Sequence, residues 1–368
     1  MLAAFSLLIL SSTASAAAAA LAPNAAITDV VAFGDSLTDN GNLFKKYGLP
    51  PAPYWNGRFS TGPVWVEYLS QYLNNATLHN YAFGGSVSNI ANADNSSVAG
   101  SSTVFANMIP DFPSQIEVYK TDAAIPLDTT LFTIFIGGND FNYAVNAGKV
   151  PNPVAVATNV LNGVQRLITL GAKNILVTAM TPLYLMPSFN GNAALVPKIK
   201  ALVDGYNGIL FAGISKLQTA VPSGVNIIVN DQTKLLTYIA TPQGSSEFKF
   251  PNTTGACFQR KANPPTVCAV STDYFFFDNI HPTTRGQNFM AQYAYNQIYN
   301  ISGFLAPEDV VNPPLKPTTA DTKATYVAPS PTSQTVYVAP LKTQLYSGAV
   351  VCLESGILAM IVGLALLI

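Results

Sequence analysis

The chain has 368 residues, of which 49% are hydrophobic and only 10% charged, and its formal net charge is −1. Because this composition can bury a large core, it excludes disorder throughout the chain. It contains no basic patch, which argues against nucleic acid as a partner.

The first 22 residues have the features of a secretory leader. Residues 1–10 are mostly apolar, and residues 11–22 are rich in Ala and Ser, with small residues spaced for cleavage at Ala14-Ser15-Ala16 and Ala20-Leu21-Ala22. An amino-terminal membrane anchor is the alternative, but the apolar run is shorter than the ~20 residues that span a bilayer. We therefore predict a signal peptide over residues 1–22, although no Lys or Arg precedes the apolar run.

Strands and helices alternate along the chain from residue 29 to residue 299. Such alternation predicts an α/β fold in which a five-stranded parallel sheet is covered by helices on both faces. A polar loop over residues 88–102 interrupts the pattern, and its length suggests a functional or variable insertion. Strands are expected at residues 29–35, 78–83, 131–136, 174–180 and 225–230, and helices at residues 63–73, 113–120, 152–170, 194–217, just after Asp231, and 283–299.

The first strand ends in Gly34-Asp35-Ser36 and a polar, glycine-bearing loop. Ligands of open α/β sheets bind just beyond the carboxyl ends of the strands, so Ser36 lies where chemistry is expected. A serine hydroxyl is a weak nucleophile, however, and needs a base and an oxyanion hole.

The search for a base is short because the chain has two histidines, His79 and His281. His281 follows Asp278 by three positions, a spacing that lets the carboxylate orient the imidazole toward Ser36. Taken alone, an Asp-x-x-His pattern is more often structural. His79 falls in the second strand and is interpreted as structural or exposed, and Asp35 as a residue that fixes the loop.

Candidate oxyanion donors also follow strands. They are the backbone N–H groups of Ser36 and Gly85 and the side-chain amide of Asn139. Each has an ordinary structural alternative, a tight turn for Gly84-Gly85 and a strand-end cap for Asn139. The conjunction of all these groups in one order is what favours the catalytic interpretation.

This order of blocks resembles the GDSL, or SGNH, hydrolase superfamily. The family's serine matches Ser36, its glycine Gly85, its asparagine Asn139, and its aspartate and histidine Asp278 and His281, within a domain predicted over residues 23–306. The Gly34–Asn42 block and residues 57–65 look like the branch of plant GDSL esterases and fungal acetylesterases of carbohydrate esterase family 16. The resemblance implies a flavodoxin-like α/β/α sandwich and ester hydrolysis without metal or cofactor.

The predicted substrate is an acetyl ester of plant cell-wall oligosaccharides. Tyr54 and Trp55 could stack on a sugar if they line the cleft, although such aromatics are at least as often packed over the domain. A GDSL lipase or phospholipase acting on longer acyl chains is the alternative, and it would need an apolar groove for the acyl chain. A non-catalytic surface-binding protein of the same fold is a third possibility, disfavoured because no member of the constellation is missing.

Features outside the catalytic blocks also predict export. Cys352 lies in the carboxyl-terminal tail, residues 347–368, and would be lost if that tail is cleaved from the mature protein. Cys257 and Cys268 then remain and are predicted to form one disulfide. Residues 307–346 are rich in Pro, Thr and Ser and predict a stalk. Residues 347–368 are predicted to be a GPI-attachment signal, with a retained tail anchor as the alternative. Sequons for glycosylation begin at Asn75, Asn95, Asn252 and Asn300.

Overall fold

The computed structural model describes residue 21 and residues 25–90, 109–120 and 125–301, together with the backbone of residues 335–336. Most of the predicted leader, stalk and tail, the greater part of the polar loop and the sequon at Asn95 lie outside these ranges. Leu21 is buried, and its N–H donates to the carbonyl of Ile298 at 2.8 Å. No helix within the described ranges is long and apolar enough to cross a membrane.

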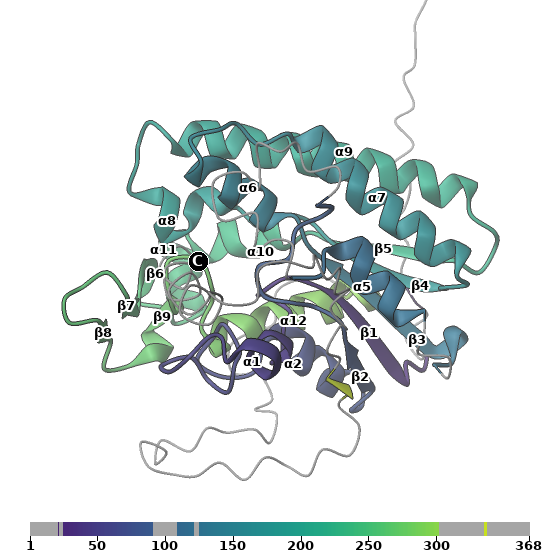
Figure 1. The fold of residues 1–368 in the computed structure, drawn as a ribbon, viewed down its shortest axis with the longest axis horizontal. Helices are drawn as coiled ribbons and strands as arrows, with labels where there is room; N and C mark the ends of the chain where they lie inside the picture. The colour runs from purple at the N-terminus through teal and green to yellow at the C-terminus, as the bar shows by residue number, and fades with distance from the viewer. Residues whose placement is uncertain (1–20, 22–24, 91–108, 121–124, 302–334, 337–368) are drawn as a thin grey trace, which may run out of the picture.

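A parallel sheet forms the centre of the domain, with strand order β10-β2-β1-β3-β4-β5 (Figure 1). The five longer strands match the predicted sheet, and their order 2-1-3-4-5 is flavodoxin-like, as expected. The sixth strand, β10, has only two residues and pairs beside β2, so it extends the sheet that the sequence predicted. The strands are β1 (Asp29–Gly34), β2 (Thr77–Asn80), β3 (Thr130–Phe135), β4 (Asn174–Thr178), β5 (Asn226–Asn230) and β10 (Thr335–Val336).

Helices cover both faces of the sheet, giving three layers (Figure 1). Helices α5, α7 and α9 lie on one face, and α2 packs with α12 on the other. The helices are α1 (Asn42–Tyr47), α2 (Trp65–Tyr72), α5 (Phe112–Tyr119), α6 (Gly138–Asn146), α7 (Pro153–Thr169), α8 (Pro187–Asn190), α9 (Val196–Ala220), α10 (Gln232–Ile239), α11 (Pro242–Glu247) and α12 (Thr284–Tyr299).

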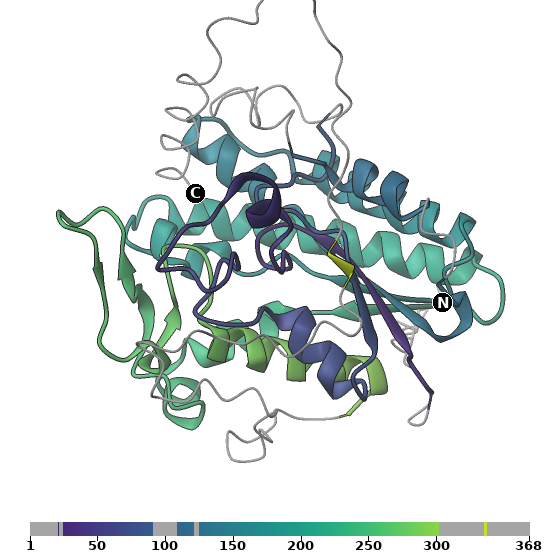
Figure 2. The same ribbon diagram turned by 60° about the horizontal axis from the view of Figure 1, so that its bottom comes forward.

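Short strands between α11 and α12 form two small sheets outside the main one. Strand β6 (Asn252–Ala256) pairs with β9 (Tyr274–Phe276), and β7 (Phe258–Gln259) pairs with β8 (Thr266–Val267) in a hairpin. This hairpin projects from the side of the domain (Figure 2). A disulfide joins Cys257 to Cys268 at its base, as the sequence predicted.

Burial of the sheet on both faces explains why its strands are continuous apolar runs in the sequence. All six residues of β3 and all five of β4 are buried, because helices cover both faces of the sheet. Strand β2 ends at Asn80, three residues earlier than predicted, where the side-chain amide of Asn42 donates to the carbonyls of Asn80 and Ala82 at 2.8 and 2.9 Å. These bonds engage the carbonyl groups of Asn80 and Ala82, in the part of the chain where a longer strand was expected.

Three of the predicted sequons lie in described residues. Asn75 and Asn300 are exposed, and both adopt left-handed backbone angles at φ 58° and 51°. Asn252 is half-buried, and its side-chain Oδ1 accepts from the N–H of Gly255 at 2.7 Å. Glycosylation of these sites stays a prediction.

Candidate active site

Ser36 stands two residues beyond β1 in a turn fixed by its neighbour Asp35. A Cβ on Gly34 would lie 2.6 Å from the carbonyl oxygen of Phe135, so only glycine allows β1 and β3 to approach this closely. The Asp35 carboxylate accepts the N–H of Leu37 at 3.0 Å, which agrees with the loop-fixing role predicted for it. The turn therefore holds Ser36 at the edge where the parallel strands end.

Two successive contacts of hydrogen-bond length connect Ser36 to His281 and His281 to Asp278. His281 Nε2 lies 2.8 Å from Ser36 Oγ, and His281 Nδ1 lies 2.7 Å from Asp278 Oδ2. The three side chains are nearly inaccessible to solvent. Residues 245 positions apart in the sequence thus meet with the connectivity that nucleophilic catalysis by serine requires.

The loop before α12 fixes the aspartate relative to the histidine. Asp278 Oδ1 accepts the backbone N–H groups of Ile280 and His281 at 2.8 and 2.7 Å. The carbonyl of His281 in turn accepts the N–H of Phe277 at 2.7 Å. A three-residue spacing is therefore enough to close the loop and point the carboxylate at the imidazole.

Electrostatics keep Asp278 ionised. Burial alone would raise the pKa of this carboxyl group, but the charge of His281 and hydrogen bonds from His281 and Tyr54 outweigh burial and lower the pKa to about 2. A carboxylate that stays charged can hold the imidazole in one orientation and stabilise an imidazolium.

Two of the three candidate oxyanion donors, Asn139 and Gly85, lie next to Ser86. Asn139, in the first turn of α6, donates one N–H of its side-chain amide to the carbonyl of Ser86 at 2.9 Å. Gly85, the residue before, has a φ of 86°, which side-chain-bearing residues rarely adopt. Within the described part of the chain, the backbone N–H groups of Ser36 and Gly85 donate to no other backbone group. They are available to a developing oxyanion.

Two buried side chains hold these loops together. Gln115 on α5 accepts the N–H of Gly34 and donates to the carbonyl of Gly34 and to Ser86 Oγ, at 2.9, 2.9 and 3.0 Å. Asp39 accepts the N–H of Gly84 at 2.8 Å while it also caps the first turn of α1 through Gly41 and Asn42. The serine loop and the glycine loop are thus fixed relative to each other.

A small pocket of about 30 Å³, open to solvent, lies beside Ser36. Asn139 and Ser36 both line it, so these two residues share one space. Most of its lining is apolar and comes from the ends of β3 and β4 and from the segment around α8. The apolar lining residues are Leu37, Phe135, Ile136, Met180, Leu183, Met186, Phe189 and Ile280.

Tyr54 and Trp55 do not share one environment. Tyr54 is 6% exposed, and its hydroxyl donates to Asp278 Oδ2 at 2.5 Å, so its ring presents no face to a sugar. Tyr54 is therefore not placed to stack on a sugar, as was expected, and contacts Asp278 instead. Trp55 is half-buried, with the guanidinium of Arg58 5.1 Å from its ring centroid, and its role in sugar binding stays a prediction.

Sequence reasoning missed Phe59 and Arg260, which lie near the histidine and the aspartate, and it gave Tyr54 a different role. Tyr54, Phe59 and Arg260 lie more than 200 residues from their partners or on a separate hairpin, and no spacing in the sequence connects them. Asp39 and Asn42 could have been found, because both belong to the polar block that follows Ser36. In the described ranges, no group of three or more His, Cys, Asp or Glu side chains is placed to hold a metal ion.

A sequence profile of the GDSL-like lipase/acylhydrolase family matches residues 30–294. The chain belongs to this family. The matched range includes Ser36, Gly85, Asn139, Asp278 and His281, and the family predicted from the sequence is confirmed. The flavodoxin-like strand order of the sheet agrees with the predicted fold class.

Individual relatives of this chain have different named activities. The thermolabile hemolysin of Vibrio parahaemolyticus is 29% identical over 300 residues, covering 76% of this chain and 65% of that protein. The phosphatidylcholine-sterol acyltransferase of Aeromonas hydrophila is 28% identical over 242 residues, covering 63% of this chain and 66% of that protein. The chain thus spans just under two thirds of these relatives. The solved structure of the acetyl xylan esterase AlAXEase is 12% identical, covers 73% of this chain and 98% of its own, and has a TM-score of 0.41.

Proposed function

We propose that this GDSL family member is a serine hydrolase of carboxylic esters. The observation that supports it most directly is the line of hydrogen-bonding distances from Asp278 through His281 to Ser36. In the proposed reaction, Ser36 Oγ attacks the ester carbonyl carbon and its proton passes to His281 Nε2. The tetrahedral intermediate collapses, and the leaving alcohol takes that proton. Water then attacks the acyl-enzyme with His281 as base, and the acid is released.

The oxyanion of both tetrahedral intermediates is assigned to the N–H groups of Ser36 and Gly85 and the side chain of Asn139. Asn139 supports this role because its bond to Ser86 uses only one amide hydrogen, which leaves the other for the substrate. A preorganised donor of this kind is worth about 3–4 kcal/mol in comparable enzymes.

The apolar cavity favours acyl chains longer than acetyl. Eight apolar side chains line the space beside Ser36, and burying an alkyl chain against them would contribute about 0.8 kcal/mol for each methylene group. The similarity to a phosphatidylcholine-sterol acyltransferase is in keeping with a fatty-acyl substrate. A lipase acting on longer acyl chains is therefore the first candidate, and the acetylesterase the second.

The acetylesterase acting on cell-wall oligosaccharides is kept as the second candidate. Trp55 is the residue that favours it, because this aromatic ring is partly accessible near the loop that carries Tyr54. Export through the leader and surface attachment through a GPI anchor belong to the same proposal, and they rest on the sequence of the two ends.

The function is tested on the full-length secreted protein with a fluorophosphonate probe and a panel of p-nitrophenyl acetate, butyrate and octanoate. Wild type is expected to be labelled and to hydrolyse octanoate with the highest kcat/KM, whereas Ser36→Ala loses both labelling and turnover. The exposed Ser223→Ala is the matched control and should behave as wild type. Labelling that persists in Ser36→Ala would refute the assigned nucleophile, and absence of turnover in wild type would favour a binding protein. A steep fall from acetate to octanoate would favour the acetylesterase.

A further inference from the structure

Asp278 has a second buried partner besides His281. Its Oδ2 atom, which lies 2.7 Å from His281 Nδ1, also accepts the hydroxyl of Tyr54 at 2.5 Å. With Oδ1 bound to two backbone N–H groups, both carboxylate oxygens are fully engaged. Tyr54 therefore occupies the position that decides how the carboxylate plane is turned relative to the imidazole.

The ring of Tyr54 is held by three other aromatic rings. The centroids of Phe59, Phe258 and Phe277 lie 5.7, 5.8 and 5.2 Å from its own, each in an edge-on arrangement. Such contacts fix a ring in one orientation. The hydroxyl is consequently aimed at Asp278 rather than at solvent.

Arg260 orients the tyrosine hydroxyl from the other side. Its Nη2 donates to the Tyr54 oxygen at 3.1 Å, and its guanidinium carbon lies 5.6 Å from the Tyr54 ring centroid. Because the phenol oxygen accepts from Arg260, its own hydrogen is directed to the carboxylate. The result is a directed chain from Arg260 through Tyr54 to Asp278.

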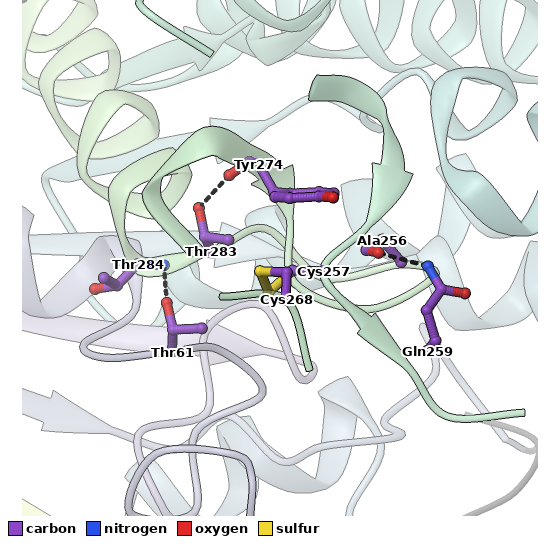
Figure 3. The surroundings of a disulfide bond; sticks show 8 residues. All are labelled: Thr61, Ala256, Cys257, Gln259, Cys268, Tyr274, Thr283 and Thr284. Atoms are coloured by element: carbon purple, nitrogen blue, oxygen red, sulfur yellow. Dashed lines mark hydrogen bonds between the residues drawn. A yellow bond between two sulfur atoms is a disulfide. The ribbon is translucent and has the colours of Figure 1, made fainter. Parts of the chain in front are cut away.

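Arg260 is carried by the β7–β8 hairpin, which is fastened to the strand that leads to Asp278. The disulfide between Cys257 and Cys268 closes the hairpin, and Gln259 Nε2 donates to the carbonyl of Ala256 at 2.6 Å (Figure 3). The N–H of Phe258 donates to the carbonyl of Phe277 at 2.6 Å, directly before Asp278. The hairpin and the aspartate loop are thus parts of one fixed unit.

We propose that Tyr54 is a positioning residue for the Asp278–His281 pair, and that Arg260 on the disulfide-closed hairpin sets the direction of its hydroxyl. The kinetic consequences rest on the proposed esterase function. Loss of the Tyr54 hydroxyl leaves Oδ2 with one partner and lets the carboxylate turn away from the imidazole. Loss of Arg260 lets the Tyr54 hydroxyl turn.

The test compares Tyr54→Phe, Arg260→Met and the double variant, with Lys261→Met as the matched control on the same hairpin. Hydrolysis of p-nitrophenyl butyrate is measured from pH 5 to 9. Tyr54→Phe is expected to lower kcat about tenfold, as for a lost hydrogen bond to a charged group, and Arg260→Met about threefold, with KM nearly unchanged. In both, the acid limb of kcat/KM should move to higher pH, because the carboxylate beside His281 is then less neutralised. Asp35, the other carboxylate whose charge acts on His281, is the same in every variant.

The two substitutions should not act independently. If Arg260 works through Tyr54, Arg260→Met costs little further activity in the Tyr54→Phe background, and Lys261→Met behaves as wild type. Effects that multiply in the double variant would overturn the assignment of Arg260. A fall in kcat without movement of the acid limb would reduce Tyr54 to a packing residue.

A measurement without substrate separates this proposal from the esterase function. The chain has two histidines, so the Nδ1–H proton resonance of His281 can be assigned by NMR with a His79→Gln variant. That resonance should move in both Tyr54→Phe and Arg260→Met, and an unmoved resonance in both overturns the positioning role. If Tyr54→Phe does not fold, Arg260→Met decides alone. Failure of the esterase function would show instead as absent Ser36-dependent labelling of wild type, while the NMR result stands.

Discussion

The imidazole of His281 lies against the ring of Phe59, with the centroids 4.9 Å apart and 33° between the ring planes. Phe59 is buried in the loop before α2, so the contact also shields one face of the imidazole from water. In the proposed mechanism, His281 becomes positively charged whenever it holds the serine proton. An aromatic face attracts such a charge, and the contact therefore favours the protonated intermediate over the resting state.

Phe59→Leu is expected to lower kcat/KM about thirtyfold, which corresponds to the ~2 kcal/mol of a buried cation–aromatic contact. The leucine keeps an apolar side chain at the site but removes the aromatic face. Initial rates on p-nitrophenyl butyrate measure the effect, and Phe44→Leu, at an exposed position on α1, serves as the control. Unchanged kinetics in Phe59→Leu would leave the contact with a packing role alone.

Asn139→Ala should reduce kcat by about 10²–10³ with little change in KM, because an oxyanion donor acts mainly in the transition state. Asn146→Ala, at the exposed carboxyl end of the same helix, is the matched control and should stay within about twofold of wild type. Circular dichroism of both variants verifies that α6 is intact. A loss of less than fivefold in Asn139→Ala would remove this side chain from the oxyanion hole.

The parts of the site that the sequence predicted are those that follow strands directly. Ser36, Gly85 and Asn139 each come shortly after a strand, so a parallel sheet brings them to one edge without knowledge of the packing. The sequence analysis did not predict helices α1 and α6. Each follows a glycine with positive φ, Gly41 at 119° and Gly137 at 114°, and a glycine in the sequence indicates a turn more readily than the start of a helix.

The surroundings of Asp278 and the walls of the cavity could not be predicted in this way. The Tyr54–Asp278 contact joins residues 224 positions apart and depends on how a loop without regular structure folds over the histidine. The cavity walls come from several elements, including a short 3₁₀ turn (Leu183–Leu185) and α8, whose four residues have no usable periodicity. Such features depend on tertiary packing rather than on local pattern.

Met186→Trp is expected to shift the preference toward short acyl chains. Met186 is 4% exposed and lines the cavity beside Ser36, so a larger ring occupies space that the acyl chain would use. We expect kcat/KM for p-nitrophenyl octanoate to fall at least tenfold, the loss of roughly two buried methylene groups. Acetate turnover by the same variant is the internal control and should be nearly unchanged. An equal loss on both esters would show that the acyl chain lies elsewhere.

Asp35→Asn is expected to stabilise the protein at pH 8 more than at pH 5. Burial raises the pKa of Asp35 from 3.8 to about 7, although its bond to the N–H of Leu37 and the charge of His281 oppose the shift. Between these two values the native state binds a proton that the unfolded chain releases, so native stability falls as pH rises and levels off above pH 7. At about 1.4 kcal/mol per pKa unit, the upper limit of this loss is about 4 kcal/mol.

The asparagine variant keeps a neutral side chain at every pH and escapes this loss. Its Tm should therefore exceed that of wild type clearly at pH 8 and much less at pH 5, as measured by calorimetry at both values. Asp140, whose pKa is raised to about 6 mainly by burial, acts in the same direction but is present in both proteins. Asp204→Asn, at an exposed position paired with Lys200, is the control and should shift Tm little at either pH. An equal Tm difference at the two pH values would mean that Asp35 is not held neutral by its burial.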